Sequence, residues 1–392
     1  MPWKRHPFRS RDIARALNIA DLRDIARRRL PGFVFEYVEG GAEDELTLRG
    51  NREAFARLRF VPQTLVDTSQ RHQRTAIFGR EAGAPLIIAP TGLNGLLHPD
   101  GDATLARAAL RYGVPYTLST VSTTRLEDLV SRVGGRLWMQ LYVVKERAIA
   151  RGIVQRAAAA GFEALVFTSD ANVFGNREWD QRGYRRPGHP TARALLDAMR
   201  HPRWAWEVLV RHGMPRFRNL EAVLSPASVT PIGASTVVPR LFDATISWDD
   251  LAWIRELWRG KLLVKGILTA SDAERAASLG VDGIVVSNHG GRQLDSCVAP
   301  IDVLAEIVRA VGTRLAIIVD SGFRRGTDVV KALALGAQAV MVGRATLYGL
   351  IAGGQPGVER ALAILTSEID RVLGQLGCNS VADLKPEFVR RV

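Results

Sequence analysis

The feature that most restricts the fold of this 392-residue chain is an alternation of short apolar runs and longer amphipathic segments. It repeats eight times between residues 86 and 344. The apolar runs have the length and the β-branched content of strands buried on both faces of a parallel sheet. Eight strand-helix units in series are typical of a closed (β/α)8 barrel. The expected strands are 86–90, 115–119, 137–143, 164–170, 262–266, 283–288, 315–321 and 339–343.

A doubly wound open sheet is the alternative fold for the same alternation. The barrel is favoured because eight units fit its closure and because the sequence contains no GxGxxG dinucleotide fingerprint. We therefore expect residues 1–392 to form a single α/β barrel domain with an N-terminal helical segment, in which 21–30 and 51–58 are helices. The helices expected after the strands are 103–112, 125–133, 148–160, 247–258, 271–279, 301–311 and 327–335, followed by a long helical tail.

One interval interrupts the alternation, between the fourth and fifth strands. The segment from about 182 to 244 is predicted to be an insertion after strand four. Its first half is dense in arginine and holds Trp204 and Trp206 among aliphatic residues, whereas 223–238 is rich in Ser, Thr and Pro. A cationic, amphipathic stretch with tryptophan suits a surface of anionic lipid. A basic lid packed on the barrel is the alternative.

The formal net charge of +13 predicts an anionic partner: nucleic acid, a membrane surface or an anionic small molecule. Nucleic acid is disfavoured, because the arginines concentrate in the insertion and around an expected anion site, without an aromatic-basic platform. Cys297 and Cys378 are the two cysteines, so a disulfide framework is not expected. The sequence also predicts no metal site, no secretory signal and no membrane-spanning helix.

Polar side chains follow the expected strands at their C-terminal ends, where enzymes with this fold carry their active residues. After the sixth strand comes Ser287–Asp295, which contains His289 and Arg292. A histidine can take a proton near neutral pH, and an arginine can hold a carboxylate through two parallel hydrogen bonds. The other residues at strand ends are Pro90, Thr91, Ser119, Gln140, Tyr142, Thr168, Asp170, Lys265 and Asp320.

The loops after the seventh and eighth strands form the usual phosphate site of this fold. Here they hold Ser321–Gly326 and Gly343–Arg344, which supply backbone N–H groups and arginine side chains. Helix capping is the alternative role for these residues. A cationic pocket with a histidine base suits an anionic substrate that loses a proton. Its expected members are His289, Arg292, Lys265, Arg177 and Arg344, opposed by Asp170 and Asp320.

Four motifs in the right order resemble the FMN-dependent (S)-2-hydroxy acid dehydrogenases and oxidases. They are SNHGGRQLD at 287–295, VKG around Lys265, DSGFRRGTDVVKALALGA from Asp320, and GGAEDELTLRGN near the start. The resemblance runs from about residue 13 to residue 378. Within that family the bacterial (S)-mandelate dehydrogenases are most similar, through APTGLNG, HPRWAWEVLVRHGMP and GRATLYGL.

The resemblance implies a role for each matching residue. His289 would be the base, Asp170 its partner, and Tyr142 the donor to the substrate hydroxyl or the developing ketone. Lys265 would support the anionic reduced flavin, and Tyr37, Arg177 and Arg292 would bind the substrate carboxylate. FMN would be held by Ala89, Pro90, Thr91, Ser119, Gln140, Thr168, Lys265, Ser287, Asp320, Gly322, Arg324, Gly343 and Arg344.

The implied reaction is oxidation of an (S)-2-hydroxy acid to the 2-keto acid, with (S)-mandelate to benzoylformate as the first choice and a membrane quinone as electron acceptor. L-lactate dehydrogenation and an oxygen-using oxidase are the alternatives. Gly92, where several oxidases of the family carry alanine, favours a dehydrogenase. The resemblance further implies a homotetramer, either in the cytoplasm or peripheral to the cytoplasmic side of the inner membrane.

Overall fold

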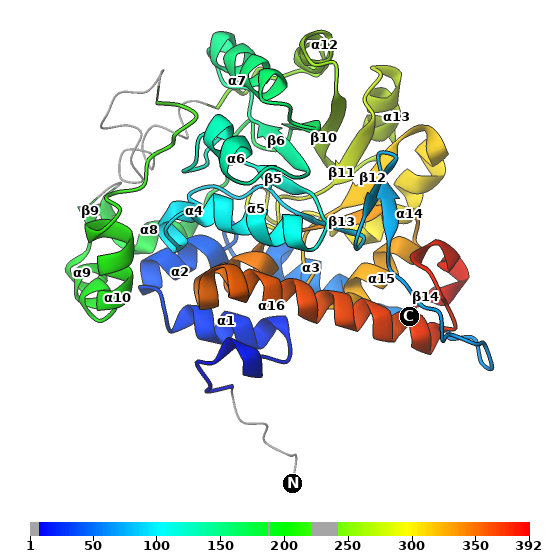
Figure 1. The fold of residues 1–392 in the computed structure, drawn as a ribbon. Helices are drawn as coiled ribbons and strands as arrows, with labels where there is room; N and C mark the ends of the chain where they lie inside the picture. Colours follow the sequence, from blue (N-terminus) through cyan, green and yellow to red (C-terminus); the bar gives the residue numbers. More distant parts are fainter. Residues whose placement is uncertain (1–7, 187–188, 222–241) are drawn as a thin grey trace.

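The computed structural model describes residues 8–186, 189–221 and 242–392 (Figure 1). The predicted eightfold alternation is confirmed as a closed barrel in which every neighbouring pair of strands is parallel. The strands end one or two residues earlier than predicted at all C-terminal ends except that of the fifth, because the polar residues there leave the ladder and enter loops. The barrel strands are β4 (Leu86–Ile88), β5 (Tyr116–Leu118), β6 (Leu137–Leu141), β7 (Ala164–Thr168), β10 (Lys261–Ile267), β11 (Gly283–Val286), β12 (Ala316–Val319) and β13 (Ala339–Val342).

Helices surround the barrel as an outer ring (Figure 1). Thr269 and Ser247 cap the helices that follow β10 and precede it, with side-chain oxygens that accept backbone N–H bonds. The last helix is two helices joined at a kink, since Gly353 and Gly354 are not helical and Pro356 follows them. The ring helices are α5 (Gly101–Arg111), α6 (Leu126–Arg132), α7 (Arg147–Ala159), α12 (Trp248–Leu257), α13 (Ala270–Ser278), α14 (Pro300–Val311), α15 (Gly326–Ala334) and α16 (Arg344–Leu376).

Alternate strand residues fill the inside of the barrel, and the others pack against the ring helices. The inner cluster is apolar and buried, with Trp138 its largest member. The N-terminal end of the barrel is closed by a hairpin of β2 (Thr75–Ile77) and β3 (Arg80–Ala82), whose Phe78 contacts Trp138 at 5.6 Å between ring centroids. Among the described residues the barrel interior is therefore a packed core, which leaves the C-terminal mouth for a ligand.

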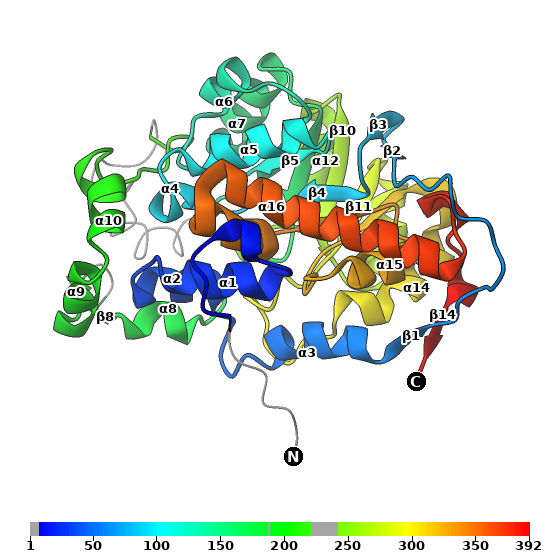
Figure 2. The ribbon, with the colours of Figure 1, turned by 60° about the horizontal axis from the view of Figure 1, so that its bottom comes forward.

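The N-terminal segment is helical, as predicted, but its helices begin earlier than expected. α1 (Ile19–Arg27) buries Ile19, Leu22 and Ile25. It lies beside α16, as Figures 1 and 2 both show. The segment also contains η1 (Ile13–Arg15), α2 (Gly32–Glu39), α3 (Leu46–Ala56) and β1 (Leu58–Phe60), which pairs with the C-terminal β14 (Val389–Arg391).

The insertion after β7 forms a separate helical projection at one side of the barrel (Figure 1). Trp204 is buried and donates its indole N–H to Leu96 O, which ties the projection to the barrel. Residues 222–241 lie outside the described part of the chain, and so does the predicted 223–238 segment. The described elements are α8 (Glu178–Arg182), β8 (Tyr184–Arg186), β9 (His189–Pro190), α9 (Ala192–Met199), α10 (Pro202–Trp204) and the π-helical η2 (Ala205–Val210).

Short elements complete the described chain. α4 (Asn94–Leu97) follows β4, η3 (Gly312–Arg314) follows α14, and η4 (Val381–Asp383) and η5 (Pro386–Phe388) precede β14. None of the helices among the described residues is both long and apolar enough to cross a bilayer.

Candidate active site

A cavity of about 800 Å³ opens at the C-terminal ends of the barrel strands. Its wall combines residues from the strand ends, the N-terminal segment and the start of the insertion. All the residues predicted for the site line this cavity except Asp170 and Ser287, which stand directly behind lining residues. The structure therefore brings the predicted constellation together in one place.

His289 is held between two polar neighbours. Its Nδ1 lies 2.9 Å from Asp170 Oδ1, and its Nε2 lies 3.3 Å from the Tyr142 hydroxyl and faces the cavity. The backbone of His289 is left-handed, with φ of +58°, and its N–H donates to Ser287 Oγ. This strained conformation turns the imidazole from the strand end toward Asp170. One ring nitrogen is thus oriented by a carboxylate, while the other faces the cavity beside the Tyr142 hydroxyl.

The environment sets the proton-binding strength of this group. Burial lowers the pKa of His289 below its ordinary value, although the charge of Asp170 opposes the shift. Burial would raise the pKa of Asp170, but His289 and Lys265 outweigh it and keep this carboxyl ionised. Burial, assisted by Asp170, raises the pKa of Tyr142 to about 12. Near neutral pH the arrangement is a neutral imidazole with a carboxylate behind it and a protonated phenol beside it, as general base catalysis requires.

Lys265 places a positive charge on the floor of the cavity. Its Nζ donates to Ser287 Oγ at 2.8 Å and lies 3.2 Å from Asp320 Oδ2. Burial would lower the pKa of Lys265, but Asp320 and Asp170 outweigh burial and raise it. The ammonium group is therefore a fixed cation that faces the cavity.

A polar network crosses three adjacent strand ends. The Gln140 side chain donates to Thr168 Oγ1 at 3.0 Å and accepts from Ser119 Oγ at 3.1 Å. Beside it, Thr91 and Asn94 exchange hydrogen bonds, and Asn94 also donates to the buried Asp102. These contacts fix the rotamers of the polar groups and hold the loop that contains Ala89, Pro90 and Thr91.

Two arginines approach the histidine from the loop side. Arg177 donates to Arg292 O and to Gln293 Oε1, and Arg292 donates to Gly40 O at 2.7 Å. Burial and the neighbouring Arg292 lower the pKa of Arg177 to about 10. The Tyr37 ring lies under the Arg292 guanidinium. Two cations beside a histidine suit a ligand that carries a carboxylate.

The opposite end of the cavity is bordered by the loops after β12 and β13. Gly322, Arg324, Gly343 and Arg344 line it. The Arg344 guanidinium donates to Val38 O, Gly40 O and Gly290 O, and burial lowers its pKa to about 10. The Arg344 side chain thus braces the N-terminal segment against the histidine loop, and anion binding at this position is left to its backbone at the start of α16.

Sequence reasoning did not predict Asp180, or the apolar wall of Phe174, Phe217 and Phe242. Asp180 Oδ2 lies 3.4 Å from Arg292 Nη2. These residues come from α8 and from loops around the insertion, so no strand-end rule points to them. The sequence after Arg177, REWDQR at 177–182, is charged and contains one tryptophan. Such a composition is equally typical of a solvent-exposed helix, so it does not predict a site residue.

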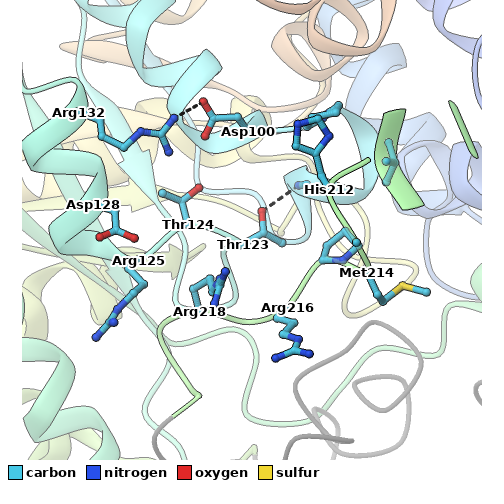
Figure 3. Close-up of a pocket in the computed structure, with 15 residues that line it drawn as sticks. Asp100, Thr123, Thr124, Arg125, Asp128, Arg132, His212, Met214, Arg216 and Arg218 are labelled. Atoms are coloured by element: carbon cyan, nitrogen blue, oxygen red, sulfur yellow. Dashed lines mark hydrogen bonds and ion pairs between the residues drawn. The ribbon is translucent and has the colours of Figure 1, made fainter. Parts of the chain in front are cut away.

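A second cavity, of about 690 Å³, lies between the loop after β5 and the segment that follows η2 (Figure 3). Arginines are arranged around its hollow, and one of them, Arg132, is paired with Asp100. It holds none of the residues predicted for the site. The arginines are Arg125, Arg132, Arg216 and Arg218.

The barrel-mouth cavity fits a flavin mononucleotide by its size and its donor set. Its volume lies within the range of about 300–1,000 Å³ that is usual for cofactor sites. Fixed amide and hydroxyl groups and the Lys265 ammonium line its floor, as an electron-accepting ring requires. Glycine-rich loops with arginines close the end where this fold binds phosphate. The described residues contain no group of His, Cys, Asp or Glu that could hold a metal ion.

Comparisons with known proteins agree with this geometry. The family model described as FMN-dependent dehydrogenase matches residues 26–391. The chain is 47% identical to (S)-mandelate dehydrogenase of Pseudomonas putida over 374 residues, which cover 95% of this chain and 93% of that protein. It is 40% identical to L-lactate dehydrogenase of Pectobacterium atrosepticum, with coverage of 95% and 96%.

Solved structures give the same result. The crystal structure of the monotopic membrane protein (S)-mandelate dehydrogenase superposes with a TM-score of 0.91 at 46% identity, over 96% of this chain and 100% of that one. A mandelate oxidase variant with (S)-mandelic acid superposes with a TM-score of 0.79 at 36% identity, over 96% and 98%. The predicted resemblance and the predicted fold are confirmed.

Proposed function

Because this chain belongs to the FMN-dependent dehydrogenase family, we propose that its barrel-mouth cavity binds an (S)-2-hydroxy acid and oxidises it to the 2-keto acid. The observation that carries the proposal is the grouping of His289, Asp170 and Tyr142 beside Arg177 and Arg292 in one cavity. When bound, FMN supplies the acceptor for the two electrons that leave the substrate.

The cofactor would be held by the strand ends. Gln140, Ser119 and Thr168 present fixed polar groups, and the Lys265 ammonium would stabilise the negative charge of a reduced flavin. Backbone groups of Ala89–Thr91 would lie along the ring. Ribityl and phosphate groups would be held by Asp320, Gly322, Arg324, Gly343 and Arg344.

The substrate would be oriented by its two polar groups. Its carboxylate would be bound by Arg177 and Arg292 with Tyr37, and its hydroxyl would meet the Tyr142 hydroxyl and His289 Nε2. His289 then accepts a proton from the hydroxy acid at Nε2. Asp170, 2.9 Å from Nδ1, stabilises the imidazolium that forms. The site thus binds the acid, removes a proton and retains the charge.

An aromatic substrate suits the remaining wall. Phe174, Phe217 and Phe242 line the cavity together with Leu93 and Leu96. A phenyl group would bury its area against these side chains, whereas the methyl group of lactate would leave much of the wall uncovered. (S)-mandelate is therefore the first choice, and L-lactate is the alternative that the similar lactate dehydrogenases support.

The test is anaerobic bleaching of the flavin by a panel of 2-hydroxy acids. We expect (S)-mandelate to reduce the FMN-loaded protein faster than lactate or glycolate at equal saturation. Faster reduction by lactate would overturn the choice of substrate, and no reduction by any member of the panel would overturn the reaction. Peroxide release that matches turnover in air would favour an oxidase over a quinone-linked dehydrogenase.

We further propose that the projection after β7 binds the membrane surface peripherally, on the cytoplasmic side, and that a quinone there receives the electrons. Support comes from the monotopic structural neighbour and from exposed apolar residues next to arginines. The arginine-lined cavity of Figure 3 is also lined by Val208 of η2 and by Met214 from the segment that follows η2. The exposed apolar residues are Leu195, Leu196, Met199, Trp206 and Val210.

The assembly state is proposed to be a homotetramer, from the family resemblance alone. Light scattering coupled to size-exclusion chromatography of the FMN-loaded protein measures it directly. A monomeric mass at micromolar concentration would overturn this part of the proposal.

A further inference from the structure

A carboxylate of the chain itself already lies against one of the two arginines that would bind the substrate. Asp180 Oδ2 is 3.4 Å from Arg292 Nη2, and both residues line the barrel-mouth cavity. The two side chains are only 20% and 14% exposed. A hydroxy acid brings its own carboxylate to this place, so the proposed chemistry does not require an acidic side chain here.

Among the described residues, the Asp180 side chain accepts one hydrogen bond, from Arg292 Nη2 to Oδ2. Its second oxygen, Oδ1, is buried and has no hydrogen-bond partner in the described part of the chain. A buried carboxylate oxygen without a donor is unfavourable, and it is retained only where the backbone dictates it. The end of α8 is held closely, since a Cβ at Gly183 would lie 2.7 Å from Phe33 Cβ. Asp180 thus turns one oxygen to Arg292 and leaves the other without a partner among the described residues.

The Asp180 carboxyl group partly offsets the positive charge of the neighbouring arginines. The three guanidinium groups of Arg177, Arg292 and Arg344 surround it. Burial raises the pKa of Asp180, although these cations oppose the shift. Arg292 in turn helps to lower the pKa of Arg177, and Asp180 works in the opposite direction. Asp180 thus places a carboxyl group against this group of cations, with its closest ion pair to Arg292.

We propose that Asp180 is a specificity-determining residue that competes with the substrate carboxylate for Arg292, an inference that rests on the proposed function. A competing anion weakens the binding of every carboxylate. Ligands that also offer a hydroxyl to Tyr142 and His289 recover the loss through these additional contacts. Acids that lack the hydroxyl are rejected, and release of the 2-keto acid is favoured.

The test uses phenylacetate, which has the carboxylate and phenyl groups of mandelate but no hydroxyl. Its binding to FMN-loaded protein is followed by the change in flavin absorbance and by calorimetry. For Asp180→Asn we expect the Kd of phenylacetate to fall roughly five- to ten-fold, because an opposing charge has been removed from a partly buried site. The KM for (S)-mandelate falls as well, so the effect appears in binding rather than in the rate constant at saturation.

Two further variants separate the charge from the shape of the side chain. Asp180→Glu keeps the charge, and its Kd for phenylacetate should stay within about two-fold of the original. Glu178→Gln removes a negative charge from the same helix, where Glu178 is exposed and pairs with Arg182. It should leave both phenylacetate binding and flavin reduction unchanged.

An unchanged or increased Kd in Asp180→Asn would overturn the inference, since Asp180 would then merely orient Arg292. The phenylacetate titration does not depend on turnover. If no 2-hydroxy acid reduces the flavin, the proposed function fails, and the titration still decides whether Asp180 opposes carboxylate binding.

Discussion

At the scale of single residues, the chemistry depends on the unequal treatment of the two nitrogens of one imidazole. His289 Nδ1 is bound by Asp170, and Nε2 is left beside Tyr142 in the cavity. Burial keeps the ring neutral, and the carboxylate behind it stabilises the charge once the proton has arrived. Burial and Asp170 therefore set both the pKa of the free base and the stability of the imidazolium that it forms.

Replacing the base should remove the chemistry without removing the cofactor. For His289→Gln we expect the rate of flavin reduction by (S)-mandelate to fall by roughly 10²–10⁴, the usual contribution of a general base. FMN should remain bound, because the cofactor contacts come mainly from other strand ends. Stopped-flow absorbance measures the rate, and the flavin-to-protein absorbance ratio measures retention. Reduction at more than a tenth of the original rate would refute the assignment.

The partner of the base predicts a shift in pH dependence. The proton acceptor must be neutral, so the rate falls as the pH drops through the pKa of His289. The charge of Asp170 raises that pKa against the effect of burial. In Asp170→Asn the acid limb of the pH-rate profile should therefore move to lower pH, while the maximal rate falls because the imidazolium loses its counter-charge. A shift toward higher pH would contradict this account.

At the scale of elements, the sequence predicted what is periodic and local. All eight strands and the helices after them could be placed because apolar runs and amphipathic segments alternate over 86–344. The pairing of β1 with β14 joins residues from opposite ends of the chain, so no local pattern marks it. Asp180 was missed for a similar reason, since it reaches the site through the packing of α8 and not through a strand end.

Close packing between elements predicts where a single methyl group is not tolerated. A Cβ at Gly326, the first residue of α15, would lie 2.5 Å from Glu368 Cβ and from Ile369 N of α16. We expect Gly326→Ala to lower the free energy of unfolding by about 1–3 kcal/mol, the usual cost of overpacking. Gly152 in α7 has open space around its Cβ position.

The matched substitution Gly152→Ala should be neutral, or stabilising by up to about 1 kcal/mol, because alanine is the better helix former. Urea unfolding of both variants with saturating FMN measures the difference. Equal stability of the two would show that α15 and α16 adjust to the added methyl group.

At the scale of the whole molecule, three parts meet at the mouth of the barrel. The strand ends supply the base and the cofactor contacts, the N-terminal segment supplies Tyr37 and the carbonyl groups that anchor the arginines, and the loop after β7 supplies Arg177. The outer part of the insertion points away from the barrel (Figure 1). Catalysis and surface attachment can therefore be altered separately.

This separation predicts a variant that is active but detached. The double substitution Leu196→Ser and Trp206→Ser removes two exposed apolar side chains from the projection. We expect binding to vesicles of anionic lipid to fall at least several-fold, because the buried apolar area decreases, while flavin reduction in solution is retained. Vesicle co-sedimentation measures the binding.

The control is Leu65→Ser with Leu110→Ser, two exposed apolar residues on other parts of the surface. Their replacement should leave co-sedimentation unchanged. Equal loss in both double variants would show that attachment does not depend on the projection.

A single carbonyl oxygen, Gly40 O, accepts hydrogen bonds from both Arg292 and Arg344. The first of these arginines faces the acid and the second borders the phosphate end of the cavity. A ligand that orders the region around one of these arginines also helps to fix the turn at Gly40. The second ligand then binds with a smaller loss of conformational entropy. Binding of the acid and binding of FMN should then strengthen each other by the same factor. We therefore expect the protein without FMN to bind the carboxylate more weakly than the FMN-loaded protein does.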